Sequence, residues 1–151
     1  MILRKIIKKK KHPSNSSVQL EIERFIIEKL RLDSGKHTKF SDSYVDLDGK
    51  NEDGFFEIYA HIGELKVGSC RKIINDAVKL FLAAKFNKKK NKTIIFVDGS
   101  IEKRFKGNSW HSVVFREFGI DIKIVKIPLY LEKKLKDAQI RQAKGIVKRK
   151  K

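Results

Sequence analysis

The sequence feature that most constrains the fold is a buried-strand signature at residues 93–97, which read Thr-Ile-Ile-Phe-Val. Turn-forming residues bound this run, with the charged stretch 87–92 before it and Asp98 and Gly99 after it. A continuous apolar run of this length between turn signals is typical of a strand that is covered on both faces. Helices on the two sides of a sheet provide such cover, so the run predicts a layered α/β domain.

Hydrophobic periodicity predicts further elements on both sides of this strand. Apolar residues recur at helical spacing over residues 17–32, 69–86, 109–118 and 128–142. Strand patterns cover residues 38–47, 55–62 and 121–127, and the polar stretch 48–54 is expected to be a hairpin connection. The predicted order is α-β-β-α-β-α-β-α, which indicates an α/β fold with a mixed central sheet flanked by helices.

Length and cysteine content limit the class of protein. A chain of 151 residues, 40% of them hydrophobic, has the size of one domain with one core. No run approaches the ~20 apolar residues of a membrane span, and a lysine block interrupts the N-terminal segment before it can form a signal peptide. The single cysteine, Cys70, excludes an intramolecular disulfide framework. These features predict a cytoplasmic protein with no membrane partner.

Positive charge is concentrated at the two ends of the chain. The net charge is +18, and residues 1–11 and 141–151 contain many basic residues but no acid. We therefore expect a basic N-terminal tail at 1–15, a single domain at 16–140 and a basic C-terminal tail at 141–151. Such tails suit contacts with phosphates, although either tail alone is also explained as a solvated terminus. The side chains expected to bind nucleic acid are Lys8, Lys9, Lys10, Lys11, Lys148, Arg149 and Lys150.

Two acids on successive strand segments, Asp48 and Glu57, are the best candidates for chemistry. Glu57 lies in a strand otherwise rich in apolar residues, on an alternating face that also carries Tyr59 and His61. If the two segments pair as a hairpin, Asp48 approaches Glu57, and converging carboxylates disfavour each other's ionised forms. A divalent cation such as Mg²⁺ or Mn²⁺ relieves that repulsion and keeps bound water for chemistry. The alternative is that both acids are exposed strand and turn residues.

This pattern resembles the PD-(D/E)xK, or restriction-endonuclease-like, nuclease superfamily over about residues 16–98. That superfamily has a core of order α-β-β-β-α-β, with an acid on one hairpin strand and an acid-x-Lys motif on the next. The chain is also similar to uncharacterised small bacterial proteins that share the Tyr-Ala-His run at residues 59–61. The resemblance implies Mg²⁺-dependent hydrolysis of DNA, with Asp48 and Glu57 as metal ligands and Glu21 as an auxiliary acid.

The chain departs from the family pattern at the lysine, because Tyr59 stands two residues after the second acid. A tyrosine, with a pKa near ~10, does not supply the positive charge of a lysine. Because members of the superfamily sometimes carry this lysine on a neighbouring element, Lys66 and Lys72 are the expected substitutes. His61 is a further candidate, as a metal ligand, a phosphate donor or a general base.

The sequence leaves other functions open. The main alternative is a non-catalytic nucleic-acid-binding protein with a degenerate nuclease fold, and a small RNA- or ribosome-associated basic protein is a third. DNA is favoured over RNA as the partner, and a homodimer is expected only by analogy with enzymes of this fold. Trp110 is expected in the core, with stacking on a base as its alternative role.

Overall fold

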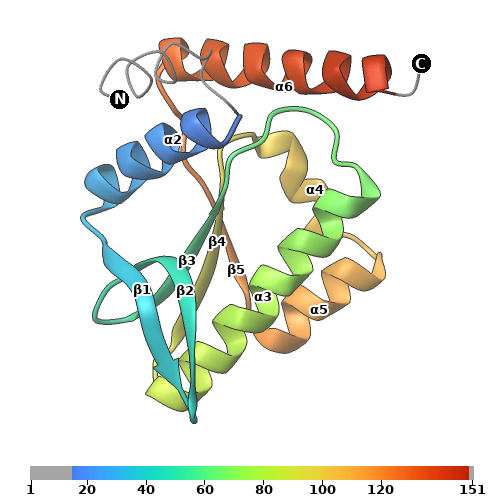
Figure 1. The fold of residues 1–151 in the computed structure, drawn as a ribbon. Coiled ribbons are helices and arrows are strands. Elements are labelled where there is room, and N and C mark those ends of the chain that lie inside the picture. Colours follow the sequence, from blue (N-terminus) through green and yellow to red (C-terminus); the bar gives the residue numbers. More distant parts are fainter. Residues whose placement is uncertain (1–14, 150–151) are drawn as a thin grey trace.

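The computed structural model describes residues 15–149 as a sheet with helices on both faces (Figure 1). The five helices with α geometry are α2 (Asn15–Leu30), α3 (Val67–Asn87), α4 (Glu102–Lys106), α5 (Trp110–Phe118) and α6 (Leu129–Arg149). The strands are β1 (Asp33–Phe40), β2 (Ser43–Lys50), β3 (Gly54–Tyr59), β4 (Asn91–Phe96) and β5 (Asp121–Ile124), and a 3₁₀ turn, Gly99–Ile101, precedes α4.

The strands form one mixed sheet in the order β1-β2-β3-β4-β5. The pairs β1–β2 and β2–β3 are antiparallel, whereas β3–β4 and β4–β5 are parallel. β4 lies inside the sheet, where Ile94, Ile95 and Phe96 are buried. The buried strand expected at 93–97 is therefore confirmed, and so is an α/β fold with a mixed sheet flanked by helices.

Helices cover the two faces of the sheet with two separate cores. The first, which we call the α2/α6 core, is aliphatic and consists of Val18, Ile22, Ile26, Ile58, Ala60, Ile95, Val125, Ile127, Leu131, Leu135 and Ala138. The second, the α3/α5 core, is rich in aromatic rings and consists of Leu47, Phe55, Tyr59, Ile73, Ala77, Leu80, Ala83, Ala84, Ile94, Phe96, Ile101, Phe105, Phe115 and Ile120. Residues of β3 alternate between the two cores, as the period of two in a strand requires.

The structure corrects the strand boundaries around the first hairpins. The single strand expected at 38–47 is two strands, β1 and β2, joined by a tight turn at which Ser41 adopts a φ of 52°. The connection expected at 48–54 is shorter, because residues 48–50 belong to β2. The side-chain oxygen of Asn51 closes the turn by accepting hydrogen bonds from the amides of Asp53 and Gly54.

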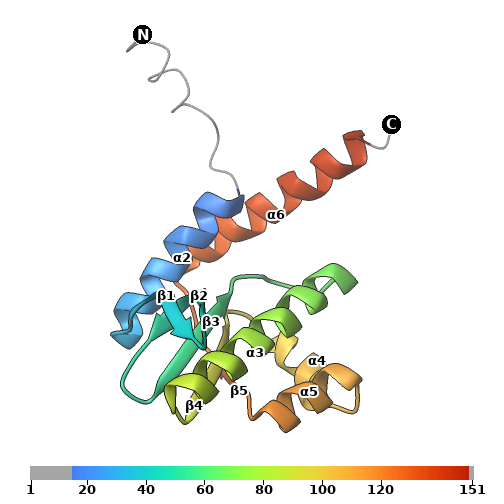
Figure 2. The ribbon, with the colours of Figure 1, turned by 60° about the horizontal axis from the view of Figure 1, so that its bottom comes forward.

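Helix α6 runs beyond the rest of the domain (Figure 2). It was expected to end near residue 142, but it continues to Arg149, so most of the expected basic C-terminal tail is part of a helix. Lys148 and Arg149 lie in its last turn, whereas Lys8, Lys9, Lys10, Lys11 and Lys150 lie outside the described residues. In the described part of the chain, none of the helices combines the length and apolar character that crossing a membrane requires.

Candidate active site

Asp48 and Glu57 lie at the point where β2 and β3 separate. Backbone pairing joins Gly49 to Phe56 and Lys50 to Phe55, and the same register places Asp48 opposite Glu57. At that position side-chain carboxylate oxygens, instead of backbone carbonyl oxygens, accept the hydrogen bonds between the strands. The amide of Asp48 donates to Oε1 of Glu57 at 3.0 Å, and the amide of Ile58 donates to Oδ2 of Asp48 at 2.7 Å. The hairpin thus brings the two acids together.

Helix α3 adds a third acid and a lysine to this place. The side chains of Glu57 and Asp76 are only 7% and 11% exposed, and the negative charge of Asp76 raises the pKa of Glu57. Nζ of Lys79 lies 3.4 Å from Oδ1 of Asp76 and 3.8 Å from Oε2 of Glu57. The positive charge of Lys79 therefore offsets part of the negative charge of this pair.

Helix α2 contributes Glu23 from its own side. Burial and then the negative charge of Asp48 raise the pKa of Glu23 to about 7, while the charge of Lys72 lowers it. The elements α2, β2, β3 and α3 therefore each supply one acid, and each of these acids influences the pKa of another or is influenced by it. We call these four residues the acid cluster: Glu23, Asp48, Glu57 and Asp76.

The acid cluster holds protons more tightly than isolated carboxyl groups do. Burial, followed by the negative charges of Asp48 and Asp76, raises the pKa of Glu57 to about 9. Burial is also the main cause of the raised pKa values of Asp48 and Asp76. Removal of water and repulsion between like charges both disfavour the ionised forms. Acids perturbed in this way cluster at functional sites, although structural networks can perturb them too.

The donor set of the acid cluster suits a hard divalent cation, because carboxylate oxygens are the ligands that Mg²⁺ prefers. Within residues 15–149, however, no group of three or more Asp, Glu, His or Cys side chains is arranged to hold a metal ion. The hydrogen bonds explain this, since Asp48 and Glu57 point oxygens at backbone amides and Asp76 faces Lys79. Each carboxylate offers about four acceptor positions, so a rearranged cluster has oxygens available for a cation.

Lys66 and Lys72 were expected to replace the missing lysine. Of these two, Lys72 lies beside the Tyr59 ring and acts electrostatically on the acid cluster. Its Nζ lies 5.8 Å from the centre of the Tyr59 ring, and its charge lowers the pKa values of Glu23, Asp48 and Asp76. The Lys72 side chain is exposed, so it can also contact a phosphate outside the protein. The sequence pattern did not predict Lys79, which contacts two of the acids directly.

Tyr59, His61 and Lys66 line a cavity of about 480 Å³ that neither Asp48 nor Glu57 lines. This cavity lies between the loop after β3, the start of α3 and α6. Nε2 of His61 is 3.0 Å from the carbonyl oxygen of Glu64, and burial raises the pKa of Tyr59. Tyr59 therefore lines the cavity and also has Lys72 beside its ring.

Glu21, the acid expected beside Asp48, lies at the other edge of α2. Its carboxylate pairs with Nζ of Lys134 on α6 at 3.2 Å, in a partly exposed position. Asp46, two residues before Asp48 on β2, lies outside the acid cluster, since it is exposed and its Oδ1 accepts a hydrogen bond from the amide of His37 at 2.9 Å. Asp76 was missed even though it carries a usable signal, a charge on the apolar stripe of α3 near Ile73 and Leu80.

No protein-family model matches the chain, and neither the curated proteins nor the solved structures give a match. The function of the acid cluster therefore rests on its own geometry and chemistry, within an α/β fold that supports many activities.

Proposed function

We propose that the protein is a metal-dependent endonuclease that hydrolyses phosphodiester bonds in DNA and has a restriction-endonuclease-like core. The acid cluster is the observation that carries this proposal, because four buried or half-buried acids with raised pKa values lie together. The element order α2-β1-β2-β3-α3-β4 supports it, since it follows the α-β-β-β-α-β order of that superfamily. Asp48 and Glu57 stand on β2 and β3, the hairpin strands on which the superfamily carries its acids.

Asp48 and Glu57 would hold Mg²⁺ or Mn²⁺, with Glu23 taking the auxiliary role first expected of Glu21. A bound ion of this kind activates a water molecule and neutralises charge at the scissile phosphate. The chain's own contribution is to hold the acids in a site from which water is largely removed, where their charges act strongly. Asp76 and Lys79 fix the Glu57 carboxyl group from the side of α3.

Lys72 takes the role of the lysine that Tyr59 replaces. Its ammonium group lies over the Tyr59 ring, so the tyrosine positions the charge that it cannot itself supply. From this position the ammonium group attracts a phosphate toward the acids and stabilises negative charge that develops on it. The net charge of +18 supports a nucleic-acid partner, because it attracts a polyanion over long distances.

The test is a cleavage assay with Mg²⁺ and Mn²⁺ titrations over duplex, branched, flapped and single-stranded DNA, with RNA for comparison. Asp48→Asn and Glu57→Gln should abolish cleavage while leaving the fold intact. Lys72→Ala should reduce the rate by two or more orders of magnitude, and Lys72→Arg should restore part of it. Asp46→Asn is the matched control, because Asp46 lies on the same strand but outside the acid cluster. Unchanged cleavage by Asp48→Asn would overturn the proposal.

Non-catalytic binding of nucleic acid is the second candidate function, and two observations favour it. The Lys79 ammonium group already neutralises part of the acid cluster, and Tyr59 stands where the superfamily has its lysine. On this alternative the protein binds the same substrates but cuts none of them at any metal concentration. Equal binding by the wild-type protein and Asp48→Asn, without cleavage by either, would favour it.

A further inference from the structure

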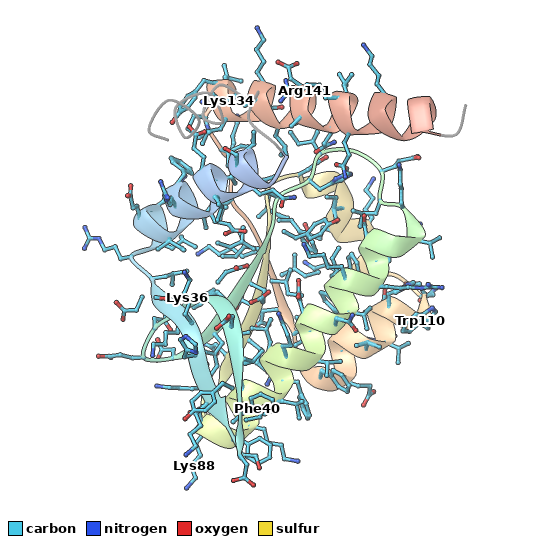
Figure 3. The ribbon with its side chains drawn as sticks, viewed as in Figure 1. Lys36, Phe40, Lys88, Trp110, Lys134 and Arg141 are labelled. Carbon is cyan, nitrogen blue, oxygen red and sulfur yellow. The ribbon has the colours of Figure 1, made fainter. Side chains whose placement is uncertain are left out.

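The only tryptophan of the chain, Trp110, lies on the surface rather than in the expected core. Its side chain is at the outer edge of α5 (Figure 3), and the residue is 59% exposed. The indole ring lies 4.1 Å from the His111 ring at an angle of 31°. His111 in turn contacts the edge of Phe105, a ring of the α3/α5 core. Trp110 is thus the outermost of a series of aromatic rings rooted in the core.

Hydrogen bonds hold the segment that carries Trp110 in place. The hydroxyl groups of Ser109 and Ser112 both donate to the carbonyl oxygen of Arg104, at 3.0 Å and 3.1 Å. Nη1 of Arg116 donates to the carbonyl oxygen of Gly107 at 2.9 Å. Because α4 and α5 are tied together on both sides of the Trp110 backbone, a ligand that stacks on the indole ring loses little affinity to ordering this segment.

Basic residues and two cavities lie next to this segment. Lys103 and Arg104 line a cavity of about 510 Å³ together with the loop at residues 63–65. Glu64 lines both this cavity and the one that contains Tyr59 and Lys66, so the two cavities adjoin. Glu64 is the one acid among the residues that line either cavity. The two cavities therefore extend from α4 to Tyr59. Lys72, whose charge acts on the acid cluster, lies beside the Tyr59 ring.

We propose that Trp110 stacks on an unpaired base of a single-stranded nucleic acid whose backbone follows Lys103 and Arg104 toward Tyr59. An exposed aromatic ring beside basic residues is the combination that single-strand binding uses, because every base has a face for stacking and every nucleotide has a phosphate. A base in a duplex is stacked on both faces and is not available to the indole. The direction of the strand rests on the proposed nuclease function, whereas the stacking itself does not.

His111 supports the stack as an uncharged ring. Burial, followed by the positive charge of Arg104, lowers the pKa of His111, so the imidazole is neutral at pH 7. The positive charge that attracts the phosphates then comes from Lys103 and Arg104, beside the stack rather than within it.

The first experiment uses the intrinsic fluorescence of the single tryptophan. A 20-nucleotide thymidine oligonucleotide is titrated into the full-length protein at low salt, with EDTA present to prevent cleavage. Stacking should quench the fluorescence in a saturable way, and a fully paired duplex of the same length should quench it far less. No quenching by the single strand, or equal quenching by the duplex, would overturn the proposal.

The second experiment measures affinity by the polarisation of a labelled oligonucleotide. Trp110→Ala should weaken single-strand binding by about 10- to 100-fold, the usual contribution of one stacked base, and Trp110→Phe should recover part of the loss. Tyr130→Ala is the matched control, because Tyr130 on α6 is equally exposed at 59%. Replacing both Lys103 and Arg104 with Ala should lower the salt slope by about 1.4, or about 0.7 for each phosphate contact.

Two further outcomes separate this inference from the proposed function and from self-association. Asp48→Asn should lose cleavage but keep the quenching of fluorescence. Trp110→Ala should still be stabilised against thermal unfolding by Mg²⁺ or Mn²⁺. Quenching without any cleavage would therefore leave the stacking inference standing while the nuclease proposal fails. A dimer in sedimentation experiments that Trp110→Ala dissolves would instead mean that a second copy of the chain covers the indole, and this would overturn the stacking inference.

Discussion

The two faces of the sheet differ in what they bury. The α2/α6 core contains only aliphatic side chains, including Ile22, Ile95 and Leu131. On the opposite face, beneath α3, the sheet buries Glu57 and Asp76 beside the aromatic rings of the α3/α5 core. The core on one side of the sheet is thus aliphatic, whereas the core on the other side lies beside two buried acids.

This difference separates stability from chemistry within one small domain. Burying apolar surface stabilises the fold by roughly 25 cal/mol for each Å². Burying an acid costs free energy unless it is protonated, hydrogen bonded or paired, and Glu57 and Asp76 depend on all three forms of compensation. The aliphatic face therefore stabilises a sheet whose other face is destabilised by its acids. The predictions below change the aliphatic core and the acid cluster separately.

The largest effect is expected from placing a charge in the aliphatic face. Ile95 on β4 is fully buried in the α2/α6 core, so Ile95→Asp would bury an unpaired charge and should abolish folding. Ile95→Val is the conservative control and should cost only about 0.5–1.5 kcal/mol. Thermal unfolding followed by circular dichroism measures both. A soluble Ile95→Asp protein with a cooperative melt would show that this face tolerates charge as the other does.

A pH titration should reveal the raised pKa values of the acid cluster. Glu57 and Glu23 have folded-state pKa values of about 9 and about 7, above their ordinary value of 4.5. Between the ordinary and folded values, the folded state binds protons that the unfolded state has lost, so stability is greatest at low pH and falls as pH rises. The loss is about 1.4 kcal/mol per pH unit for each such proton, and Glu57 continues to contribute above pH 7, where Glu23 no longer does.

The control for this titration is Glu57→Gln, which keeps an oxygen for the amide of Asp48 but cannot ionise. Its free energy of unfolding, measured with urea, should fall less steeply with pH than that of the wild-type protein. Taking the difference between the two proteins removes the contribution of the histidines and of general charge repulsion. A wild-type stability that rises from pH 5 to pH 9 relative to Glu57→Gln would contradict the raised pKa of Glu57.

A smaller effect is expected from Mg²⁺ or Mn²⁺ at pH 8. Binding to the folded state alone adds about 2.7 kcal/mol at a metal concentration of 100 Kd, and Asp48→Asn should remove this gain. The gain should shrink at pH 5, because protons compete with the ion for the acid cluster. Asp46→Asn should behave like the wild-type protein in the same melting experiment. An equal metal effect in Asp48→Asn would place the ion elsewhere.

The smallest effect distinguishes the two glutamates of α2. Glu21→Gln removes a partly exposed ion pair with Lys134 and should change stability by less than about 1 kcal/mol. Glu23→Gln should remove the part of the pH dependence that ends near pH 7. Urea unfolding at pH 6 and pH 8 compares the two variants. If Glu21→Gln, rather than Glu23→Gln, removed this part of the pH dependence, Glu21 would belong to the acid cluster instead of Glu23.

These glutamates also show how far the sequence could predict the site. The hairpin that joins Asp48 to Glu57 followed from the turn and strand patterns. The choice between Glu21 and Glu23 did not, because the two residues flank Ile22 on opposite edges of the apolar stripe of α2. Only the orientation of the helix on the sheet decides which edge faces Asp48, and helix spacing contains no information about that orientation.

The fold was predictable where apolar periodicity is strong and not where it is weak. The buried strand β4 and the long helices α2 and α3 have clear apolar patterns. β1 lies at the edge of the sheet, its residues are mostly polar, and two irregularities interrupt its register, so no alternation marks it. The short helix α4 buries one side chain, Phe105, which is too little to create a periodic signal.

The hydrogen bonds between Asp48, Glu57 and Ile58 have a consequence for isotope exchange. The amides of Asp48 and Ile58 donate to side-chain oxygens, whereas the ladder around Gly49 and Phe56 joins backbone to backbone. A side chain can turn away without the strands separating, so these two amides can exchange with deuterium while their neighbours stay protected. Their exchange rates report rearrangements of two carboxyl groups, independently of the opening of the sheet.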